Sequence, residues 1–467
     1  MLCTFLDNYQ GEGDERIRNY FAGGNVNEIT CQYCVFNANG NIFDYQIDKI
    51  NQSVYVKGNS SDAFDSVVLL YEDQVPLYTI NNYGALEFNV TFEDVMAGNY
   101  TIGVMNDHHF NTYIFDVKFE MKVPNFIISE EEVFENLIDA IDAVAENGII
   151  YANVNYYDED NMEIEIRKSF TLKNFKDDGV IFDGSGEKWF FTIANGYTVV
   201  FDGISFTDGG IKTRASIENY GTLIINNCTF EGFETSEIIY NSGLINILNS
   251  TFSLNFVDKA LVWNEKDLVI NNVEFSSNVI NKSSAVYNSG TAEIISSNFT
   301  DNSNGGNGGA IYNSASLIVK NTVFSENEAI DGGAIYNTGY LQVLNSDFED
   351  NTANGYGGAI FTNGNNAEIY NSSFTGGFSE KDGGAIYNDG TMLVDNSTLA
   401  SNSATANGGA IYNNRALTLT QSFFGINFAE ECANIYNVGQ IQFSQNTFDF
   451  YDVILYVPDG EYSIPTT

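Results

Sequence analysis

A six-residue phrase that returns at a fixed interval constrains this chain more than any other feature. Gly-Gly-Ala-Ile-Tyr-Asn begins at Gly308, Gly332, Gly383 and Gly408, and the variant Gly-Gly-Ala-Ile-Phe-Thr begins at Gly357. These copies start 24 to 26 residues apart. A period of this length indicates one small structural unit that is repeated and stacks on its neighbours.

Two slots carry the repeat beyond this phrase. The first slot holds the asparagine that ends the phrase, with one threonine, and comprises Asn219, Asn241, Asn264, Asn288, Asn313, Asn337, Thr362, Asn388, Asn413 and Asn437. The second slot follows about eleven residues later, holds phenylalanine with one leucine, and comprises Phe206, Phe230, Phe252, Phe275, Phe299, Phe324, Phe348, Phe374, Leu399, Phe424 and Phe448. Between the slots, short runs such as Leu341–Asn345 alternate apolar and polar residues, which predicts half-buried strands separated by turns.

Three short strands and three turns in about 24 residues describe one coil of a parallel β-helix. We therefore expect an all-β chain whose main part, residues 125–449, is a parallel β-helix of about 11–13 coils. Because side chains alternate along a strand, Ile335 and Asn337 share one face and Tyr336 points to the other. The slot of Ile335 is never polar, so we expect it inside, with the asparagine amides stacked from coil to coil and the tyrosine facing outward.

The outward aromatic residues form the candidate ligand-binding surface. This aromatic column comprises Tyr240, Trp263, Tyr287, Tyr312, Tyr336, Phe361, Tyr387, Tyr412 and Tyr436, and the part from Tyr287 to Tyr412 is the predicted ligand-binding region. Exposed rings in a row can contact sugar faces or a partner protein. The alternative is a structural stack that shields the wall of the coil and binds no ligand.

Residues 1–50 share a pattern with the main array. Cys3-Thr4-Phe5 and Cys34-Val35-Phe36 match Cys228-Thr229-Phe230. We therefore expect residues 1–50 to be the terminal coils of a preceding β-helix. In a secreted protein, Cys3 and Cys34 could form a disulfide across neighbouring coils.

Residues 51–124 and the segments that flank the array differ from the repeat. Short strand-like runs separated by turns predict a small Ig-like β-sandwich over residues 51–124. A capping helix is expected over residues 129–147, with Ser129 as its N-cap, Glu132 as the capping-box partner and Gly148 as its stop. Its apolar stripe would cover the open end of the solenoid. Residues 450–467 are expected to be an exit linker.

The charge of the chain excludes several classes of partner. It has 62 acidic against 19 basic residues, for a net charge of −43. Such a field repels nucleic acids and anionic membranes, so we expect neither as a partner. The sequence contains no run of 18 apolar residues, and we therefore expect no membrane insertion within this segment.

The repeated phrases, together with phenylalanine followed three residues later by asparagine, resemble the repeats of chlamydial polymorphic membrane proteins. The helix at residues 129–147, the early coils from Val180 to Phe206 and the Ig-like region are more similar to adhesin-like surface proteins of methanogenic archaea. Both resemblances imply a pectate-lyase-like, right-handed β-helix. They also imply a location at the cell surface or in the cell wall, and a role in adhesion. They supply no catalytic residues.

Catalysis would need residues that the array does not bring into a repeated cluster. Polysaccharide lyases of this fold use an arginine or lysine base beside calcium-binding carboxylates, and glycosidases use two carboxylates at a set separation. The basic residues of the array are Lys259, Lys266, Lys282, Lys320, Lys381 and Arg415, with Lys212 and Arg214 at its start, and none lies in a repeated acidic cluster. We therefore expect no catalytic residues and no cofactor.

Two patterns in the sequence have residue types that can bind a metal ion. Asp301, Glu326 and Asp350 lie one coil apart, where they could hold a weak calcium ion or form a solvated edge. Cys31 and Cys34 have the spacing of metal ligands, but no second pair follows. The two histidines, His108 and His109, are expected in a surface loop. We predict no metal site.

These patterns together predict a non-catalytic cell-surface adhesin or stalk protein, which attaches to glycans or proteins of other cells. The alternative is a carbohydrate-active β-helix protein, a lyase or hydrolase, that acts on acidic polysaccharide.

Overall fold

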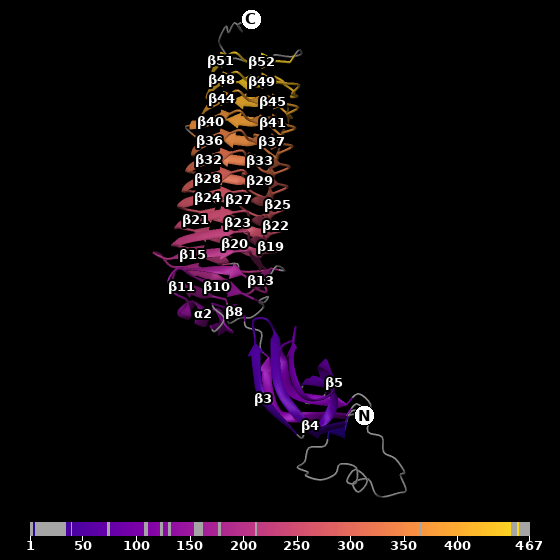
Figure 1. Ribbon diagram of the computed structural model, residues 1–467. Helices are drawn as coiled ribbons and strands as arrows, with labels where there is room; N and C mark the ends of the chain where they lie inside the picture. The colour runs from indigo at the N-terminus through magenta and orange to yellow at the C-terminus, as the bar shows by residue number, and fades with distance from the viewer. Residues whose placement is uncertain are drawn as a thin grey trace. The chain divides into compact units, whose positions relative to one another are not determined.

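The computed structural model describes residues 3–4, 34–38, 40–71, 75–106, 111–121, 125–128, 132–153, 162–175, 179–210, 213–364, 366–449 and 455–456. The chain forms two compact units, Met1–Pro124 and Asn125–Thr467. Figure 1 shows a mostly antiparallel sheet in the first unit and a long stack of short parallel strands in the second.

The first unit is a seven-stranded sheet in the order β1-β2-β7-β6-β4-β3, with β5 paired to β4. Its strands are β1 (Cys3–Thr4), β2 (Cys34–Asn37), β3 (Gly40–Asp48), β4 (Ser53–Tyr71), β5 (Val75–Phe92), β6 (Gly98–Asn106) and β7 (Asn111–Met121). A buried cluster that includes Val54, Phe88, Tyr100 and Phe119 forms its own hydrophobic core. Register shifts between Asn59 and Phe64 mark irregularities in the pairing of the two long strands β4 and β5.

The structure shows no boundary at residue 50. Strand β3 pairs with β4 from Gly40 opposite Ser60 to Asp48 opposite Ser53, and β2 pairs with β7. Residues 34–48 therefore belong to the same sheet as residues 53–121, because non-local backbone pairing joins them. Strands β1 and β2 are parallel with Cys3 opposite Cys34. The side chains of these two cysteines lie outside the described residues, so their disulfide stays a prediction.

The second unit is a parallel β-solenoid with three sheets of 15, 12 and 19 strands, here called sheets 1, 2 and 3. Sheet 1 contains β8 (Phe126–Ile127), β9 (Val133–Phe134), β10 (Gly148–Ala152), β12 (Phe170–Asn174), β15 (Thr198–Asp202), β18 (Thr222–Asn226), β21 (Leu244–Leu248), β24 (Asp267–Asn271), β28 (Thr291–Ile295), β32 (Ser316–Lys320), β36 (Tyr340–Leu344), β40 (Asn366–Tyr370), β44 (Thr391–Asp395), β48 (Ala416–Thr420) and β51 (Gln440–Ser444). Sheet 2 contains β13 (Val180–Asp183), β16 (Ile204–Thr207), β19 (Thr229–Glu231), β22 (Thr251–Ser253), β25 (Glu274–Ser276), β29 (Asn298–Thr300), β33 (Val323–Ser325), β37 (Asp347–Glu349), β41 (Ser373–Thr375), β45 (Thr398–Ala400), β49 (Phe423–Phe424) and β52 (Thr447–Phe448).

Sheet 3 contains β11 (Ile164–Ile166), β14 (Phe191–Ile193), β17 (Ile217–Asn219), β20 (Glu234–Asn241), β23 (Phe256–Asn264), β26 (Val279–Ile280), β27 (Ser284–Asn288), β30 (Ser303–Asn304), β31 (Ile311–Asn313), β34 (Glu328–Ala329), β35 (Ile335–Asn337), β38 (Thr352–Ala353), β39 (Ile360–Thr362), β42 (Phe378–Ser379), β43 (Ile386–Asn388), β46 (Ser403–Ala404), β47 (Ile411–Asn413), β50 (Ile435–Asn437) and β53 (Leu455–Tyr456). The 12 strands of sheet 2 correspond to about 12 turns of the solenoid, within the predicted range.

A stack of phenylalanine rings fills the interior beside sheet 2. The rings of Phe230 and Phe252 lie 4.5 Å apart with an angle of 6° between their planes, and Phe348 and Phe374 repeat this geometry at 4.5 Å and 5°. The phenylalanine slot is fully buried from Phe206 to Phe424. The phenylalanine slot therefore forms an interior stack, which belongs to one continuous hydrophobic core.

The asparagine slot forms a ladder of buried amides along sheet 3. Asn288 Nδ2 donates to Asn313 Oδ1 at 2.8 Å, and Asn313 Nδ2 donates to Asn337 Oδ1 at 2.7 Å. Asn313 Nδ2 also donates to the carbonyl oxygen of Tyr340 in the next coil, and Asn313 Oδ1 accepts from the backbone N–H of Ala315. Each amide is thus satisfied by its own turn and by both neighbouring coils, which confirms the predicted stacking.

A second amide ladder lies where the sequence shows phenylalanine followed three residues later by asparagine. Asn302 is fully buried, and its Nδ2 donates to Asn327 Oδ1 at 3.0 Å and to the carbonyl oxygen of Phe275 at 2.9 Å. Asn327 continues the ladder to Asn351. The sequence shows this pattern but does not indicate that its asparagines form an interior ladder.

The two glycines of the phrase have separate roles. Gly332 has a φ of +61°, the left-handed conformation that glycine adopts without strain, so it turns the chain before β35. A Cβ on Gly333 would lie 2.2 Å from the carbonyl oxygen of Gly358 in the next coil. The first glycine therefore supplies the turn, and the second permits the close approach of successive coils.

The two ends of the solenoid differ from the sequence predictions. The described helix is α2 (Leu137–Ala143), shorter than residues 129–147, and Ser129 lies outside the described residues. Asn136 is its N-cap and accepts from the N–H of Asp139 at 2.9 Å, because residues 133–134 pair with β8 as strand β9 instead. Residues 455–456, predicted to lie in a linker, form β53, which pairs with β50.

Replacing Asn313 with alanine is expected to destabilise the central coils by about 2–3 kcal/mol, because the buried amide of Asn288 loses its acceptor. Asn313→Thr is the matched control and should cost less, since Thr362 fills this slot naturally and accepts from Asn337 at 3.0 Å. Guanidinium unfolding followed by circular dichroism measures both variants. An Asn313→Ala variant as stable as wild type would contradict the role of the ladder.

Ser379 offers the opposite test, because its buried Oγ has no hydrogen-bond partner among the described residues. Its neighbours in register are Ala353 and Ala404, so Ser379→Ala should leave the unfolding free energy unchanged or raise it by up to about 1 kcal/mol. In the control Ser372→Ala, the lost Oγ accepts from the N–H of Ser346 and donates to the carbonyl of Tyr370, so stability should fall by about 1–2 kcal/mol. Equal losses in both variants would be inconsistent with this assignment.

Candidate functional site: the aromatic column of sheet 3

The aromatic column lies on the outer face of sheet 3 and stays in register along the solenoid. Tyr287 is opposite Tyr312, Tyr312 is opposite Tyr336, and the pairing continues through Phe361, Tyr387 and Tyr412. The tyrosines are half-buried, and Phe361 is 9% exposed. The predicted outward orientation is correct for the tyrosines, but their exposure is partial because each side chain packs against its neighbours.

The rings of the column stack on one another along the solenoid axis. Trp263 and Tyr287 have ring centroids 3.9 Å apart, Tyr336 and Phe361 4.7 Å apart, and Phe361 and Tyr387 5.2 Å apart. The last two pairs are within 4° of parallel. The ring faces therefore cover each other, and solvent meets ring edges and hydroxyl groups instead of the flat faces expected from the sequence. A ligand role for Tyr287 to Tyr412 stays a prediction.

Burial and nearby carboxylates change the acidity of these tyrosines. Desolvation raises the pKa of Tyr312 and of Tyr336, and the charge of Asp331 adds to the rise at Tyr336. Desolvation also raises the pKa of Tyr412, to which Asp382 contributes. The phenols are therefore neutral hydrogen-bond donors at physiological pH, along an edge that carries carboxylates.

At its N-terminal end the column departs from the repeat. Glu218 occupies the aromatic slot, and Arg214 holds its carboxylate with two hydrogen bonds, of 3.1 Å from Nε and 2.6 Å from Nη2. The Arg214 guanidinium lies 3.9 Å from the centroid of the Trp189 ring. No local sequence pattern connects Glu218 with Trp189, because only the fold brings both residues near Arg214.

The next two coils continue this cluster. The Tyr240 hydroxyl donates to Glu265 Oε2 at 2.6 Å, and Trp263 Nε1 donates to Glu265 Oε1 at 3.4 Å. Lys259 Nζ lies 6.0 Å from the Trp263 ring and forms an ion pair of 2.6 Å with Glu237, whose side chain is 8% exposed. Desolvation and the Glu265 hydrogen bond raise the pKa of Tyr240 to about 12.

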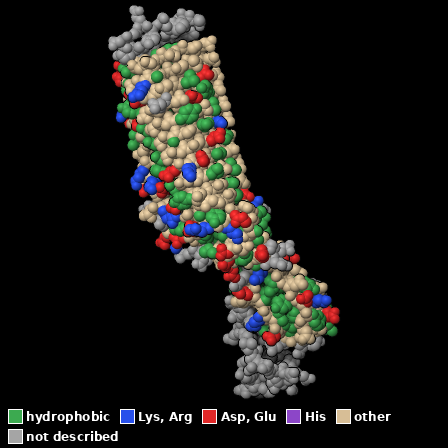
Figure 2. All heavy atoms as spheres, turned by 90° about the vertical axis from the view of Figure 1, so that its left-hand side faces the viewer, with side chains coloured by type: hydrophobic (Ala, Val, Ile, Leu, Met, Phe, Trp, Pro, Cys, Tyr) green, Lys and Arg blue, Asp and Glu red, His purple; other side chains and the backbone are tan. Residues whose placement is uncertain are grey.

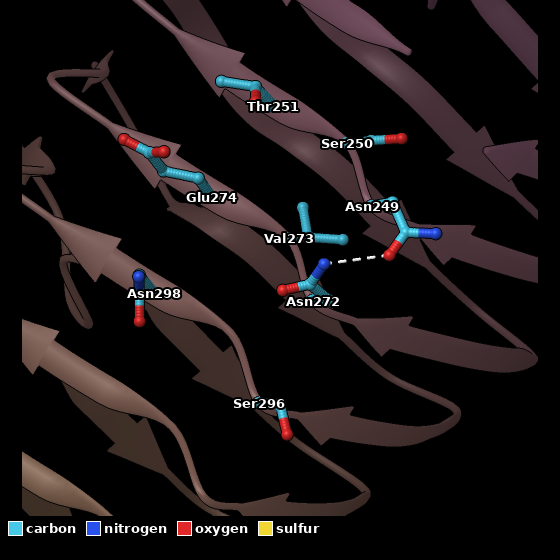
Figure 3. A pocket seen from close by; sticks show the side chains of 8 residues that line it. All are labelled: Asn249, Ser250, Thr251, Asn272, Val273, Glu274, Ser296 and Asn298. Atoms are coloured by element: carbon cyan, nitrogen blue, oxygen red, sulfur yellow. Dashed lines mark hydrogen bonds between the residues drawn. The ribbon is translucent and has the colours of Figure 1, made fainter. Parts of the chain in front are cut away.

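A polar hollow of about 260 Å³ lies on another part of the solenoid, at the turns between sheets 1 and 2 (Figure 3). Its lining comprises Asn249, Ser250, Thr251, Asn272, Val273, Glu274, Ser296 and Asn298. Asn272 Nδ2 donates to Asn249 Oδ1 at 2.9 Å, within an outer asparagine ladder that resumes from Asn321 to Asn345. Ser296 takes the same left-handed turn position and is shorter, so the hollow follows from an interruption of this ladder.

The predicted acidic column is a set of turn residues. Asp301, Glu326 and Asp350 have φ values of +53°, +56° and +52°, and Ser277 Oγ donates to Asp301 Oδ2 at 2.9 Å. Among the described residues, no group of three His, Cys, Asp or Glu could hold a metal ion. Cys31, His108 and His109 lie outside the described residues.

Four basic side chains of the array, those of Lys259, Lys282, Lys320 and Arg415, pair with carboxylates. Lys320 lies 2.7 Å from Glu293, and Lys282 lies 3.4 Å from Asp258. Figure 2 shows one face of the solenoid, on which charges of both signs are scattered and most basic side chains lie over the N-terminal half. In the parts of the chain that the structure describes, no helix is long and apolar enough to cross a membrane.

Comparisons with known proteins identify the repeat but do not establish the family of the whole chain. A model of the Chlamydia polymorphic membrane protein repeat matches residues 321–338 and 345–363. No curated protein matches the chain. The resemblance to adhesin-like proteins of methanogenic archaea is not supported by these comparisons and stays a prediction.

Two solved structures match this chain with low sequence identity and low TM-scores. One is a mannuronic acid specific polysaccharide family 6 lyase from the human gut microbiota, with 9% identity and a TM-score of 0.36, covering 67% of this chain and 83% of the lyase. The other is the periplasmic alginate epimerase AlgG, with 10% identity and a TM-score of 0.32, covering 68% of this chain and 83% of the epimerase. Similarities this low carry no argument about the function of this chain.

The stability of the solenoid is expected to fall as pH rises from about 10 to 12. The pKa values of the column tyrosines are raised in the folded state. As pH rises, the unfolded chain therefore loses its phenolic protons first, and this deprotonation stabilises the unfolded state relative to the folded state. Below pH 9 these tyrosines should contribute no pH dependence, since both states are protonated. Absorbance at 295 nm should show a group of native tyrosines that titrates later than in guanidinium. Identical titrations in both states would contradict this description of the column.

Proposed function

We propose that this chain is a non-catalytic cell-surface protein, an adhesin or stalk. It lies outside the cell and attaches to glycans or proteins of other cells. The observation that carries the proposal is the regular outer face of sheet 3, where one column of aromatic residues stays in register from Trp263 to Tyr436. Extended faces of this kind are the binding surfaces of solenoid proteins. The match to a repeat of polymorphic membrane proteins supports a surface location.

The remaining parts of the chain have supporting roles in this proposal. The antiparallel first unit acts as an Ig-like spacer. Helix α2 covers the first coil of a right-handed solenoid, in keeping with the burial of Leu137, Ala140 and Ile141 in the hydrophobic core of the solenoid.

The alternative is a carbohydrate-active protein that acts on acidic polysaccharide. Binding a polyanion requires cations that are available to it. The net charge of −43 opposes this, and the ion pairs of Lys259, Lys282 and Lys320 occupy three of the few basic side chains in the array. We therefore favour attachment over cleavage. Release of reducing sugar from an acidic polysaccharide by the purified chain would overturn that preference.

Substitution of three column tyrosines tests the attachment surface. The triple variant Tyr312→Ser, Tyr336→Ser and Tyr387→Ser is expected to reduce attachment of the full chain to cells or glycan arrays at least about tenfold, which corresponds to about 1.4 kcal/mol. The same three positions changed to phenylalanine keep the stacked rings, as Phe361 does naturally, and separate the loss of rings from the loss of hydroxyls. Attachment of the serine variant at wild-type strength, with an unchanged circular dichroism spectrum, would rule out the column as the attachment surface.

A further inference from the structure

The coils at the N-terminal end of sheet 3 break the repeat in a concentrated way. Both tryptophans of the chain, Trp189 and Trp263, lie there, and so does the only charged residue among the slots of the aromatic column, Glu218. In later coils the residues in these slots hardly change, because the rings of neighbouring coils stack on one another. Residues that depart from an otherwise fixed pattern are candidates for function, because they interrupt the aromatic stack and do not contribute to it.

Trp263 offers an indole face that the column does not cover. One side of its ring stacks on Tyr287 at 3.9 Å. Tyr240 is its partner in register on the other side, but its hydroxyl is directed to Glu265, and no stacking contact joins these two described rings. An indole face without a stacked ring, with Lys259 Nζ as far as 6.0 Å from the ring centroid, is a stacking platform for an apolar surface of a ligand.

The polar groups of these N-terminal coils are held in place. Arg214 donates to both oxygens of Glu218 and to Thr192 Oγ1 at 2.9 Å, and it lies over the Trp189 ring. Glu265 accepts from Tyr240 and Trp263. Such preorganised side chains lose little conformational entropy when a ligand binds.

We propose that the outer face of β14, β17, β20 and β23 is a saccharide-binding surface that takes a neutral oligosaccharide. This inference rests on the proposed attachment function and adds the ligand class. Four parallel strands span about 14 Å, the length of a short oligosaccharide. The indole rings would contact sugar C–H faces, and the oxygens of Glu218 and Glu265 would accept hydrogen bonds from sugar hydroxyls.

Charge selects a neutral ligand over an acidic one. Arg214 and Lys259, the cations nearest the two indoles, are already paired with Glu218 and Glu237. Glu265 adds a further carboxylate, and the chain as a whole carries a net charge of −43. A uronic acid polymer would meet repulsion here, because the two cations over the indole rings are already paired with carboxylates.

Tryptophan fluorescence of the full chain reports on this surface directly, because both tryptophans lie in it. Chitotetraose and mannotetraose serve as neutral probes, and tetramannuronate serves as the acidic probe. We expect a saturable change in emission with at least one neutral probe and none with tetramannuronate. Trp263→Phe, which keeps a ring against Tyr287, should weaken binding at least about tenfold by calorimetry, and the control Phe423→Leu, at an exposed ring of β49 in sheet 2, should bind as wild type.

The outcomes separate this inference from the proposed function. Wild-type attachment to cells combined with unchanged fluorescence, or Trp263→Phe binding at wild-type strength, would overturn the saccharide surface and leave the adhesin proposal standing. Binding of tetramannuronate in preference to both neutral probes would overturn the ligand class. Failure of the wild-type chain to attach to any cell or glycan would overturn the proposed function itself.

Discussion

Buried asparagine amides are the interaction on which the solenoid depends. Each amide in the ladder of Asn288, Asn313 and Asn337 uses its donor and its acceptor on the coils before and after it. These groups lie in an apolar interior, where an unpaired amide is costly. A coil can therefore stack only when its asparagine is in register with the asparagine of the previous coil. The second ladder, through Asn302 and Asn327, imposes the same condition near sheet 2.

The fixed register of the interior also sets the geometry outside. Once Asn313 and Asn337 are aligned, Tyr312 and Tyr336 must lie one strand spacing apart, and their rings stack at 5.1 Å. The aromatic column thus has a structural explanation that needs no ligand along most of its length. The interesting positions are those where the alignment is kept but the residue changes, as at Glu218 and Trp263. There the backbone register stays the same while the outer surface acquires different chemistry.

Much of this fold could be predicted from the sequence because the repeat supplies the same evidence many times. The interior positions of Ile335 and Asn337 follow from alternation and recur from coil to coil. The orientation of the tyrosine rings could not be predicted, since it depends on side-chain packing between coils. The pairing of Gly40 with Ser60, and the placement of Arg214 over Trp189, depend on non-local contacts that no local pattern records. The helix was predicted too long because strand pairing at residues 133–134 prevails over their helical pattern.

The exchange of asparagine side-chain amide protons tests the central role of the ladders most directly. The full chain, labelled with ¹⁵N at asparagine, would be transferred to D₂O and followed by NMR. We expect a group of Nδ2 resonances, from residues such as Asn288, Asn313 and Asn302, to persist long after exposed asparagines have exchanged, because these amides are fully buried and hydrogen-bonded. Exchange of all asparagine side chains at the rate of an unfolded chain would contradict this expectation.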